Sequence, residues 1–186
     1  AYGSNKLFVR GVDDFRDHVQ AVRAKMSGEV NDIQRLFLAG GNIFGLSTKR
    51  IIKYLDIVAS EFRSQNIRQV GAFGRTDGYL KKSVRELRSL VRNNLRMAYW
   101  GIETGADSIL QYTDKGCTHD EMVEAGKKLS KTDMKVSVML MPGLGGLKFY
   151  EDYVVETARL MNRIRPRYIT FLTVTPQPGS RYTQLM

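Results

Sequence analysis

The sequence is poor in the residues that build disulfides, metal sites and catalytic triads. It has one cysteine, Cys117, and two histidines, His18 and His119, among 186 residues. A single cysteine excludes a disulfide within the chain and any metal site that needs several cysteines. Both histidines fall in stretches with helical patterning, so we expect no Ser-His-Asp or Cys-His arrangement at the ends of strands.

Long hydrophobic runs are missing as well. No apolar stretch approaches the roughly 20 residues that a membrane helix needs, and the first ten residues lack the apolar core of a signal peptide. We therefore expect a cytoplasmic protein without membrane contact. The length and the 42% share of hydrophobic residues are typical of one globular domain.

Acidic residues are scarce relative to basic ones. The chain has 19 acidic and 29 basic residues, which gives a net charge of +10. Such an excess favours an anionic substrate or partner, such as RNA, a phosphate or a polycarboxylate. The alternative is a basic surface that is only solvated. The basic residues are spread along the predicted helices rather than gathered in one basic and aromatic tract, which favours the alternative.

Five short apolar stretches run into polar segments that mostly contain glycine. They occupy residues 36–42, 70–75, 97–105, 136–143 and 168–176. Each is typical of a buried strand of a parallel sheet, and the first predicts a strand that is buried on both faces. We expect Phe37 and Trp100 to belong to the core. If the strands are parallel, their carboxyl ends meet at one edge, where such folds place their chemistry.

Helical patterns separate these strands. They cover residues 12–26, about 48–62, 80–94, 107–112, 118–131 and 150–164. The predicted strands after the first occupy about 68–73, 97–102, 135–141 and 168–175. Alternation of this kind predicts an α/β fold with a parallel sheet. A closed eight-stranded barrel needs about 250 residues, so five strands indicate a partial barrel or a doubly wound sheet.

The predicted strand ends carry few groups for acid–base chemistry. Glu103 is the only carboxylate there, and it could act as a general base or hold the hydroxyls of a ribose. Arg75 could meet an anion. We find no strand-borne lysine, which an aldolase-like barrel would need. A site rich in backbone donors and poor in acid–base groups is typical of a cofactor site.

Several segments together resemble the radical SAM superfamily. They are LAGGN at 38–42, YWGIETG at 99–105, DKGCTHDEMVEAGKKL at 114–129, KVSVMLMPGLGG at 135–146 and ITFLTVTPQPGSRY at 169–182. The closest likeness is to the branch with the oxygen-independent coproporphyrinogen oxidases and the tRNA-modifying Elongator-type enzymes. The resemblance implies a partial TIM-like (β/α)6 barrel. It also implies an iron–sulfur oxidoreductase in which a [4Fe–4S] cluster cleaves S-adenosylmethionine to a 5′-deoxyadenosyl radical.

The resemblance also implies which residues bind S-adenosylmethionine. Gly40, Gly41 and Asn42 match the family's GGE motif, with asparagine in place of glutamate. The remaining expected cofactor-binding residues are Arg75, Glu103, Thr104, Met141, Gly143, Thr175 and Gln177. No catalytic residue is assigned, and the substrate, small or macromolecular, is not indicated. An electron donor such as flavodoxin or ferredoxin is the implied redox partner.

The sequence departs from this family in lacking the C-x3-C-x2-C motif that holds the cluster. One explanation is that the chain lacks the family's first strand and cluster loop; the other is that it never carried a cluster. We favour the first and interpret residues 1–186 as a single, N-terminally incomplete radical SAM core domain. The alternative function is a nucleotide- or RNA-binding barrel without redox chemistry.

Overall fold

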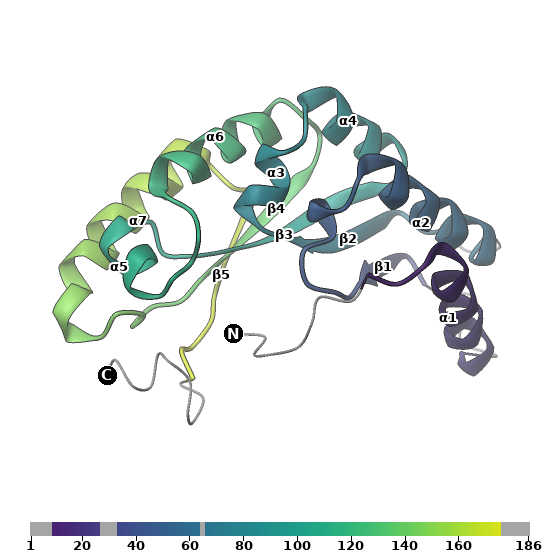
Figure 1. Ribbon diagram of the computed structural model, residues 1–186, viewed down its shortest axis with the longest axis horizontal. Coiled ribbons are helices and arrows are strands. Elements are labelled where there is room, and N and C mark those ends of the chain that lie inside the picture. Colours follow the sequence, from purple (N-terminus) through teal and green to yellow (C-terminus); the bar gives the residue numbers. More distant parts are fainter. Residues whose placement is uncertain (1–8, 27–32, 64–65, 176–186) are drawn as a thin grey trace.

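The computed structural model describes residues 9–26, 33–63 and 66–175. Five strands form one sheet in the order β1-β2-β3-β4-β5, and every neighbouring pair is parallel (Figure 1). The strands are β1 (Arg35–Leu38), β2 (Gln69–Gly74), β3 (Leu95–Glu103), β4 (Lys135–Leu140) and β5 (Tyr168–Phe171). The predicted α/β class is therefore confirmed, and the sheet is consistent with a partial TIM-like barrel.

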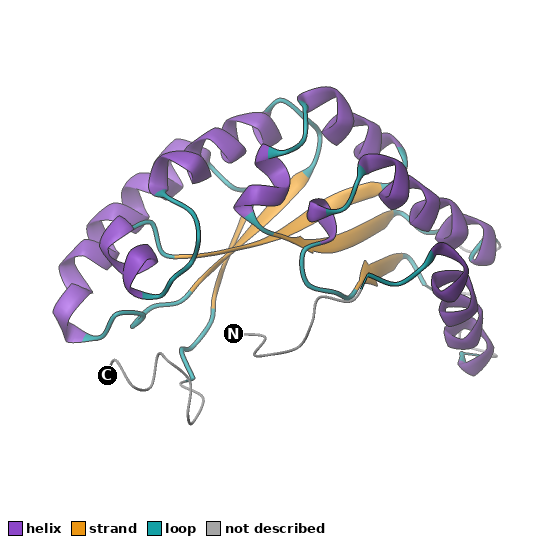
Figure 2. Ribbon diagram, viewed as in Figure 1, coloured by secondary structure: helices purple, strands orange, loops and turns teal. Residues whose placement is uncertain are grey.

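Helices follow the strands and lie along one face of the sheet (Figure 2). They are α1 (Val12–Lys25), α2 (Thr48–Glu61), α3 (Thr76–Leu80), α4 (Val84–Arg92), α5 (Asp107–Tyr112), α6 (His119–Ser130) and α7 (Tyr150–Ile164), with 3-10 turns η2 (Ile43–Gly45) and η3 (Leu147–Phe149). Alternate residues of each strand point toward this helical layer, as the period of two requires. None of the described helices is long and apolar enough to cross a membrane.

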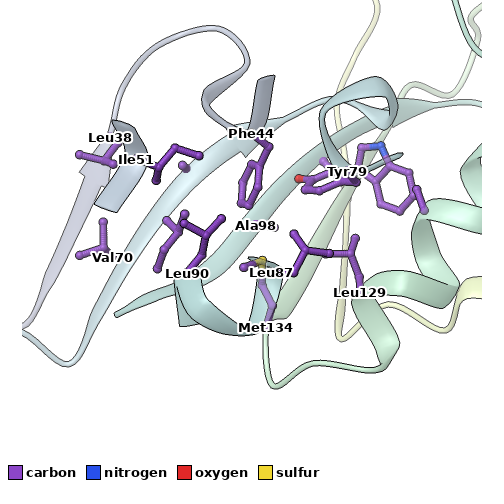
Figure 3. Close-up of a cluster of buried hydrophobic side chains, with 14 of the residues drawn as sticks. Leu38, Phe44, Ile51, Val70, Tyr79, Leu87, Leu90, Ala98, Leu129 and Met134 are labelled. Atoms are coloured by element: carbon purple, nitrogen blue, oxygen red, sulfur yellow. The ribbon is translucent and has the colours of Figure 1, made fainter. Parts of the chain in front are cut away.

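The core lies between the sheet and the helices (Figure 3). On β3 the inward residues Ala98, Trp100 and Ile102 are fully buried, so the prediction for Trp100 is confirmed. Trp100 donates its indole N–H to the Thr76 hydroxyl at 3.2 Å, which satisfies the one polar atom of that side chain. These contacts fix the carboxyl end of β3 relative to α3.

The prediction that the first strand is buried on both faces is wrong. Phe37 is 42% exposed and lies on the sheet face that the described helices leave uncovered. There it packs edge-on against Phe73 and Tyr99, with ring centroids at 4.8 and 5.4 Å. An apolar run does not distinguish a strand between two layers from a strand with one open, aromatic face.

The predicted helix 80–94 is also wrong at its start, because two helices occupy the region. Ser83 caps α4: its hydroxyl accepts the Glu86 backbone N–H, and the Glu86 carboxylate accepts the Ser83 backbone N–H at 2.9 Å. Lys82 turns inward and donates to the Leu46 carbonyl oxygen at 2.6 Å. The short α3 precedes this break. Strand β5 ends at Phe171, four residues before its predicted end.

Candidate functional site

The carboxyl ends of four strands are joined by an unbroken series of contacts. After β1, the Asn42 side-chain oxygen accepts the Arg75 backbone N–H at 3.1 Å. The Arg75 guanidinium donates to the Lys115 carbonyl oxygen at 3.3 Å, and the Lys115 ammonium lies 2.5 Å from the Glu103 carboxylate. The Met141 N–H donates to the Glu103 carbonyl oxygen at 2.9 Å. The segments that follow β1 to β4 therefore meet at one edge, as parallel strands predict.

Glu103 occupies an unusual position at the end of β3. Its φ is +68°, in the left-handed region that a residue with a bulky side chain rarely adopts. The pairing register of β3 with β4 shifts between Gly101 and Glu103, which is a bulge that redirects the strand end. Its side chain is 29% exposed, and Lys115 holds its carboxylate at the edge. Strain of this kind accumulates at ligand and catalytic sites.

The glycines after β1 have open space in front of them. Among the described residues, a Cβ built on Gly41 meets no atom within 4 Å, and one on Gly40 meets only the Ile43 side chain at 3.4 Å. Gly105, near the same edge, differs because its Cβ would lie 2.5 Å from the Glu156 carbonyl oxygen. Internal packing thus requires glycine at Gly105 but not at Gly41. The Gly40–Gly41 backbone is available to a molecule outside the chain.

The loop after β4 is anchored at one point and open at others. Leu144 is buried in a small cluster with Ala106, Ile109 and Tyr153. Gly143 has a φ of +87°, which favours glycine, and a Cβ there would meet no atom of the described part of the chain within 4 Å. The loop therefore holds an exposed backbone segment beside half-buried Met141, close to the Glu103 carbonyl oxygen.

Two of the expected cofactor-binding side chains are already engaged within the protein. Thr104 is fully buried, and its hydroxyl lies 3.3 Å from that of Thr157 and accepts the Ala106 N–H at 3.1 Å. The Asn42 amide donates to the Asp77 carboxylate at 3.3 Å while its oxygen holds the Arg75 backbone. The Thr104 hydroxyl is therefore not available to a ligand at the carboxyl edge. The Asn42 side chain connects the segment after β1 to the residues that follow β2.

Two of the remaining expected residues follow the ends of strands, Arg75 after β2 and Thr175 after β5. The Arg75 side chain is 57% exposed and lies 3.6 Å from the Asp77 carboxylate. Thr175 is exposed beyond the end of β5. Gln177 falls outside the described residues. The binding roles of all these residues stay predictions.

The sequence reasoning missed Lys115 and Asp77. Lys115 does not belong to a strand; the loop after α5 turns back and brings its ammonium group to Glu103. The flanking residues Asp114 and Gly116 both have positive φ, at 52° and 73°, which makes that sharp return possible. The Asp-Lys-Gly sequence is a turn signal, but it does not indicate what the lysine would contact. Asp77, on α3, is a second carboxylate near the edge.

The histidines and the cysteine take structural positions. His119 begins α6, and its Nδ1 lies 2.8 Å from the Gly105 carbonyl oxygen; His18 is exposed on α1. Cys117 is half-buried, and the burial raises the pKa of its thiol, which disfavours the reactive thiolate. Within the described ranges, no three histidine, cysteine or acidic side chains are grouped so that they could hold a metal ion.

A pocket of about 420 Å³ opens between α1, β1 and α2, and the segment Gly40–Asn42 lies at its margin. Its other walls are chiefly apolar and include Phe15, Val19 and Val58. Glu103, Lys115 and Gly143 do not line it. The pocket therefore suits an apolar group beside β1, whereas the polar groups of the edge lie outside it.

Comparisons with known structures agree with this architecture. No family model and no curated protein matches the sequence. The fold is similar to coproporphyrinogen III oxidase HemN from Escherichia coli, a radical SAM enzyme, with a TM-score of 0.72 and 12% identity over 95% of this chain. It is also similar to Elp3 of the archaeon Methanocaldococcus infernus, with a TM-score of 0.67 and 15% identity over 94% of this chain. HydG, a maturase of the [FeFe]-hydrogenase, matches with a TM-score of 0.66 and 14% identity over 98% of this chain.

At these identities the likeness establishes the fold. The fold is similar to that of HemN, a radical SAM enzyme, which agrees with the family resemblance of the motifs. The chain spans 41%, 44% and 40% of the lengths of HemN, Elp3 and HydG. Their matched parts thus correspond to almost all of this chain, while more than half of each of those proteins lies outside the match.

Proposed function

We propose that this chain is the part of a radical SAM enzyme that binds S-adenosylmethionine at the carboxyl edge of its sheet. The observation that carries the proposal is the linked series of strand ends, in which Glu103 is held in a left-handed conformation between two exposed glycine segments. The fold supports it, and so do the motifs at these same strand ends.

The residues of the edge suit different parts of the cofactor. The open backbone at Gly40 and Gly41 can accept an ammonium group, since carbonyl oxygens approach a ligand closely where there is no Cβ. The Glu103 carboxylate can accept hydrogen bonds from two ribose hydroxyls. Met141 and the Gly143 backbone can pack on a flat base, and the cation of Lys115 can balance a ligand carboxylate.

The iron–sulfur cluster does not fit the residues of this chain. Such clusters are held by cysteine thiolates, and Cys117 is the only cysteine of the sequence. The thiolate ligands of the cluster would therefore have to come from outside this chain. A reduced cluster held by such outside ligands would supply the electron that cleaves S-adenosylmethionine to methionine and a 5′-deoxyadenosyl radical. This chain's part would be to orient the ligand and to exclude water around it.

The proposal is tested by calorimetric titration of the purified chain with S-adenosylmethionine. We expect Glu103→Gln to weaken binding roughly tenfold or more, because hydrogen bonds to a charged acceptor contribute about 1.5–3 kcal/mol. Gly41→Val should weaken binding without unfolding the chain, because the space before Gly41 is open. Asp56→Asn removes an exposed carboxylate on α2 and serves as the matched control.

Two outcomes would overturn the proposal. One is the absence of binding to the wild-type chain, and the other is an equal loss in the Asp56→Asn control. Binding of ATP in place of S-adenosylmethionine, with the same dependence on Gly41, would instead favour the alternative of a nucleotide-binding barrel. The substrate on which the whole enzyme acts is not part of the proposal.

A further inference from the structure

The opposite edge of the sheet carries a second polar hollow, which the proposed function does not use. A depression of about 600 Å³ lies where the strands begin, and exposed cations dominate its lining. These are Arg35, Arg68, Arg92, Arg96 and Lys135, with Asp133 as the one carboxylate and Gln34, Gln69 and Val91 completing the wall. The hollow is separated from Glu103 by the length of β3.

The fold concentrates these cations at one place. Arg35 is the first residue of β1, Arg68 directly precedes β2, Arg96 is the second residue of β3, and Lys135 is the first residue of β4. Because parallel neighbouring strands all begin at the same edge, residues far apart in the sequence are brought together there. Strands about 4.8 Å apart place the cations of β1 to β4 across on the order of 14 Å.

These cations are not neutralised within the described part of the chain. No ion pair or side-chain hydrogen bond joins any of the five to another described residue, whereas Arg75, Lys115 and Lys128 each have a carboxylate within 4.0 Å. Like charges held close together repel one another unless an anion binds between them. Four of the five are arginines, whose planar guanidinium groups match the two oxygens of a phosphate.

An exposed aromatic side chain stands beside the cations. Tyr168 is the first residue of β5 and is 46% exposed. It is paired in register with Ser137, two residues beyond Lys135 on β4. A hydrogen bond from Arg167 and its charge, followed by the charges of Lys135 and Arg35, lower the pKa of the Tyr168 phenol. The ring therefore lies within the positive field of this edge.

We propose that this edge binds single-stranded nucleic acid, with phosphates on the cations of the hollow and a base stacked on Tyr168. A positive groove next to an exposed aromatic ring is the arrangement that binds single strands without sequence preference. The cations of the four strands span on the order of 14 Å, which is long enough for them to contact successive phosphates of one strand. An acidic protein could pair with the cations of the hollow, but its carboxylates would make no stacking contact with the Tyr168 ring.

The test uses fluorescence anisotropy of a labelled 12-mer oligouridine, titrated with the full chain at several salt concentrations. We expect Arg35→Gln/Arg68→Gln/Arg96→Gln to weaken binding by about thirtyfold or more in 0.1 M salt. The slope of log affinity against log salt should shrink by about 2, at about 0.7 per lost contact to a single strand. Tyr168→Ala should cost about tenfold, whereas Tyr168→Phe should retain binding because the ring remains.

The matched control is Lys49→Gln/Lys53→Gln/Lys127→Gln, which removes the same charge from exposed positions on α2 and α6. It should leave the affinity within about threefold of wild type, because screening confines such charges to roughly 10 Å. Circular dichroism melting checks that every variant folds. Oligothymidine should bind as well as oligouridine, because the proposed contacts do not involve the 2′-hydroxyl.

Several results would overturn the inference. Equal losses in the two triple variants would mean that only net charge matters. An unchanged affinity in Tyr168→Ala would show that no base stacks on Tyr168. Equally tight binding of polyglutamate, lost in the same arginine variant, would indicate an acidic protein as the partner. None of these results depends on whether S-adenosylmethionine binds at the other edge, since Glu103→Gln leaves this hollow unchanged.

Discussion

The two edges of the sheet handle charge in opposite ways. At the carboxyl edge, Lys115 is paired with Glu103, and Arg75 is held by a carbonyl oxygen and by Asp77. At the amino edge, a group of arginines and one lysine surrounds a hollow with a single carboxylate. The difference teaches that the positive net charge of the chain has two roles. Some cations cross-link strand ends, while others form no ion pair with a described residue and are the ones that we propose bind a partner.

The edges also differ in how far their contacts restrict the sequence. The carboxyl edge contains close contacts, a positive φ at Glu103 and one glycine, Gly105, that has no room for a side chain. The amino edge consists of exposed side chains at the starts of strands. Substitution of the tightly packed residues at the carboxyl edge should therefore lower stability, whereas substitution of the exposed cations at the amino edge should leave stability unchanged.

Gly105→Ala should have the largest effect on stability. The new Cβ would lie 2.5 Å from the Glu156 carbonyl oxygen, a backbone atom that cannot move aside. We expect a loss of about 2–3 kcal/mol in the free energy of unfolding, measured by urea denaturation. Gly41→Ala is the matched control and should change it by less than about 0.5 kcal/mol. Equal losses in both would show that Gly41 is as confined as Gly105.

Lys115→Met should have the next largest effect. It leaves the Glu103 carboxylate without its partner at a site where the two side chains are only 16% and 29% exposed. A pair of intermediate burial should contribute about 1 kcal/mol to the free energy of unfolding. Adding Glu103→Gln to this variant should recover part of the loss, because no unpaired charge remains. If the double variant were as unstable as the sum of both single variants, the pair would not be coupled.

Acid should lower the free energy of unfolding through Glu86, which lies near the carboxyl edge. Hydrogen bonds from the Ser83 backbone and from the Thr48 and Ser83 hydroxyls lower the pKa of Glu86 from 4.5 to about 2. Because the pKa is lower in the folded chain, the stabilisation is present above pH 4.5 and is lost as the pH falls from 4.5 toward 2. Urea unfolding over this range should show a flatter pH dependence for Glu86→Gln. An unchanged dependence would mean that these hydrogen bonds contribute nothing.

The amino edge should show the smallest effect on stability. Arg35→Gln/Arg68→Gln/Arg96→Gln should keep the free energy of unfolding within about 0.5 kcal/mol of wild type, with any change toward greater stability as repulsion is relieved. Its pH dependence should equal that of the wild-type chain, because arginine does not titrate in this range. A loss above about 1 kcal/mol would show that these cations hold the fold together, and the comparison of the two edges would fail.

Local sequence patterns were sufficient for much of the fold. The helices at 107–112 and 150–164 have the predicted bounds, and the helix predicted from residue 118 begins at His119, where Thr118 and Glu121 form a capping box. Capping and periodicity act over three or four residues, so a sequence displays them directly. The helix predicted from residue 80 failed because Ser83 caps a later start and an extra helix precedes it.

The sequence by itself determined the alternation of helices and strands, the parallel sheet that follows from it, and the strand ends with their glycines. Only the tertiary structure decided which side chains meet at each edge. Asn42 and Arg75 are separated by 33 residues, and Arg75 and Lys115 by 40. Contacts over such distances depend on the register of strands and on loop returns, such as the one at Lys115. The same holds for the arginines of the amino edge, which are dispersed in the sequence and become one surface when the strands align.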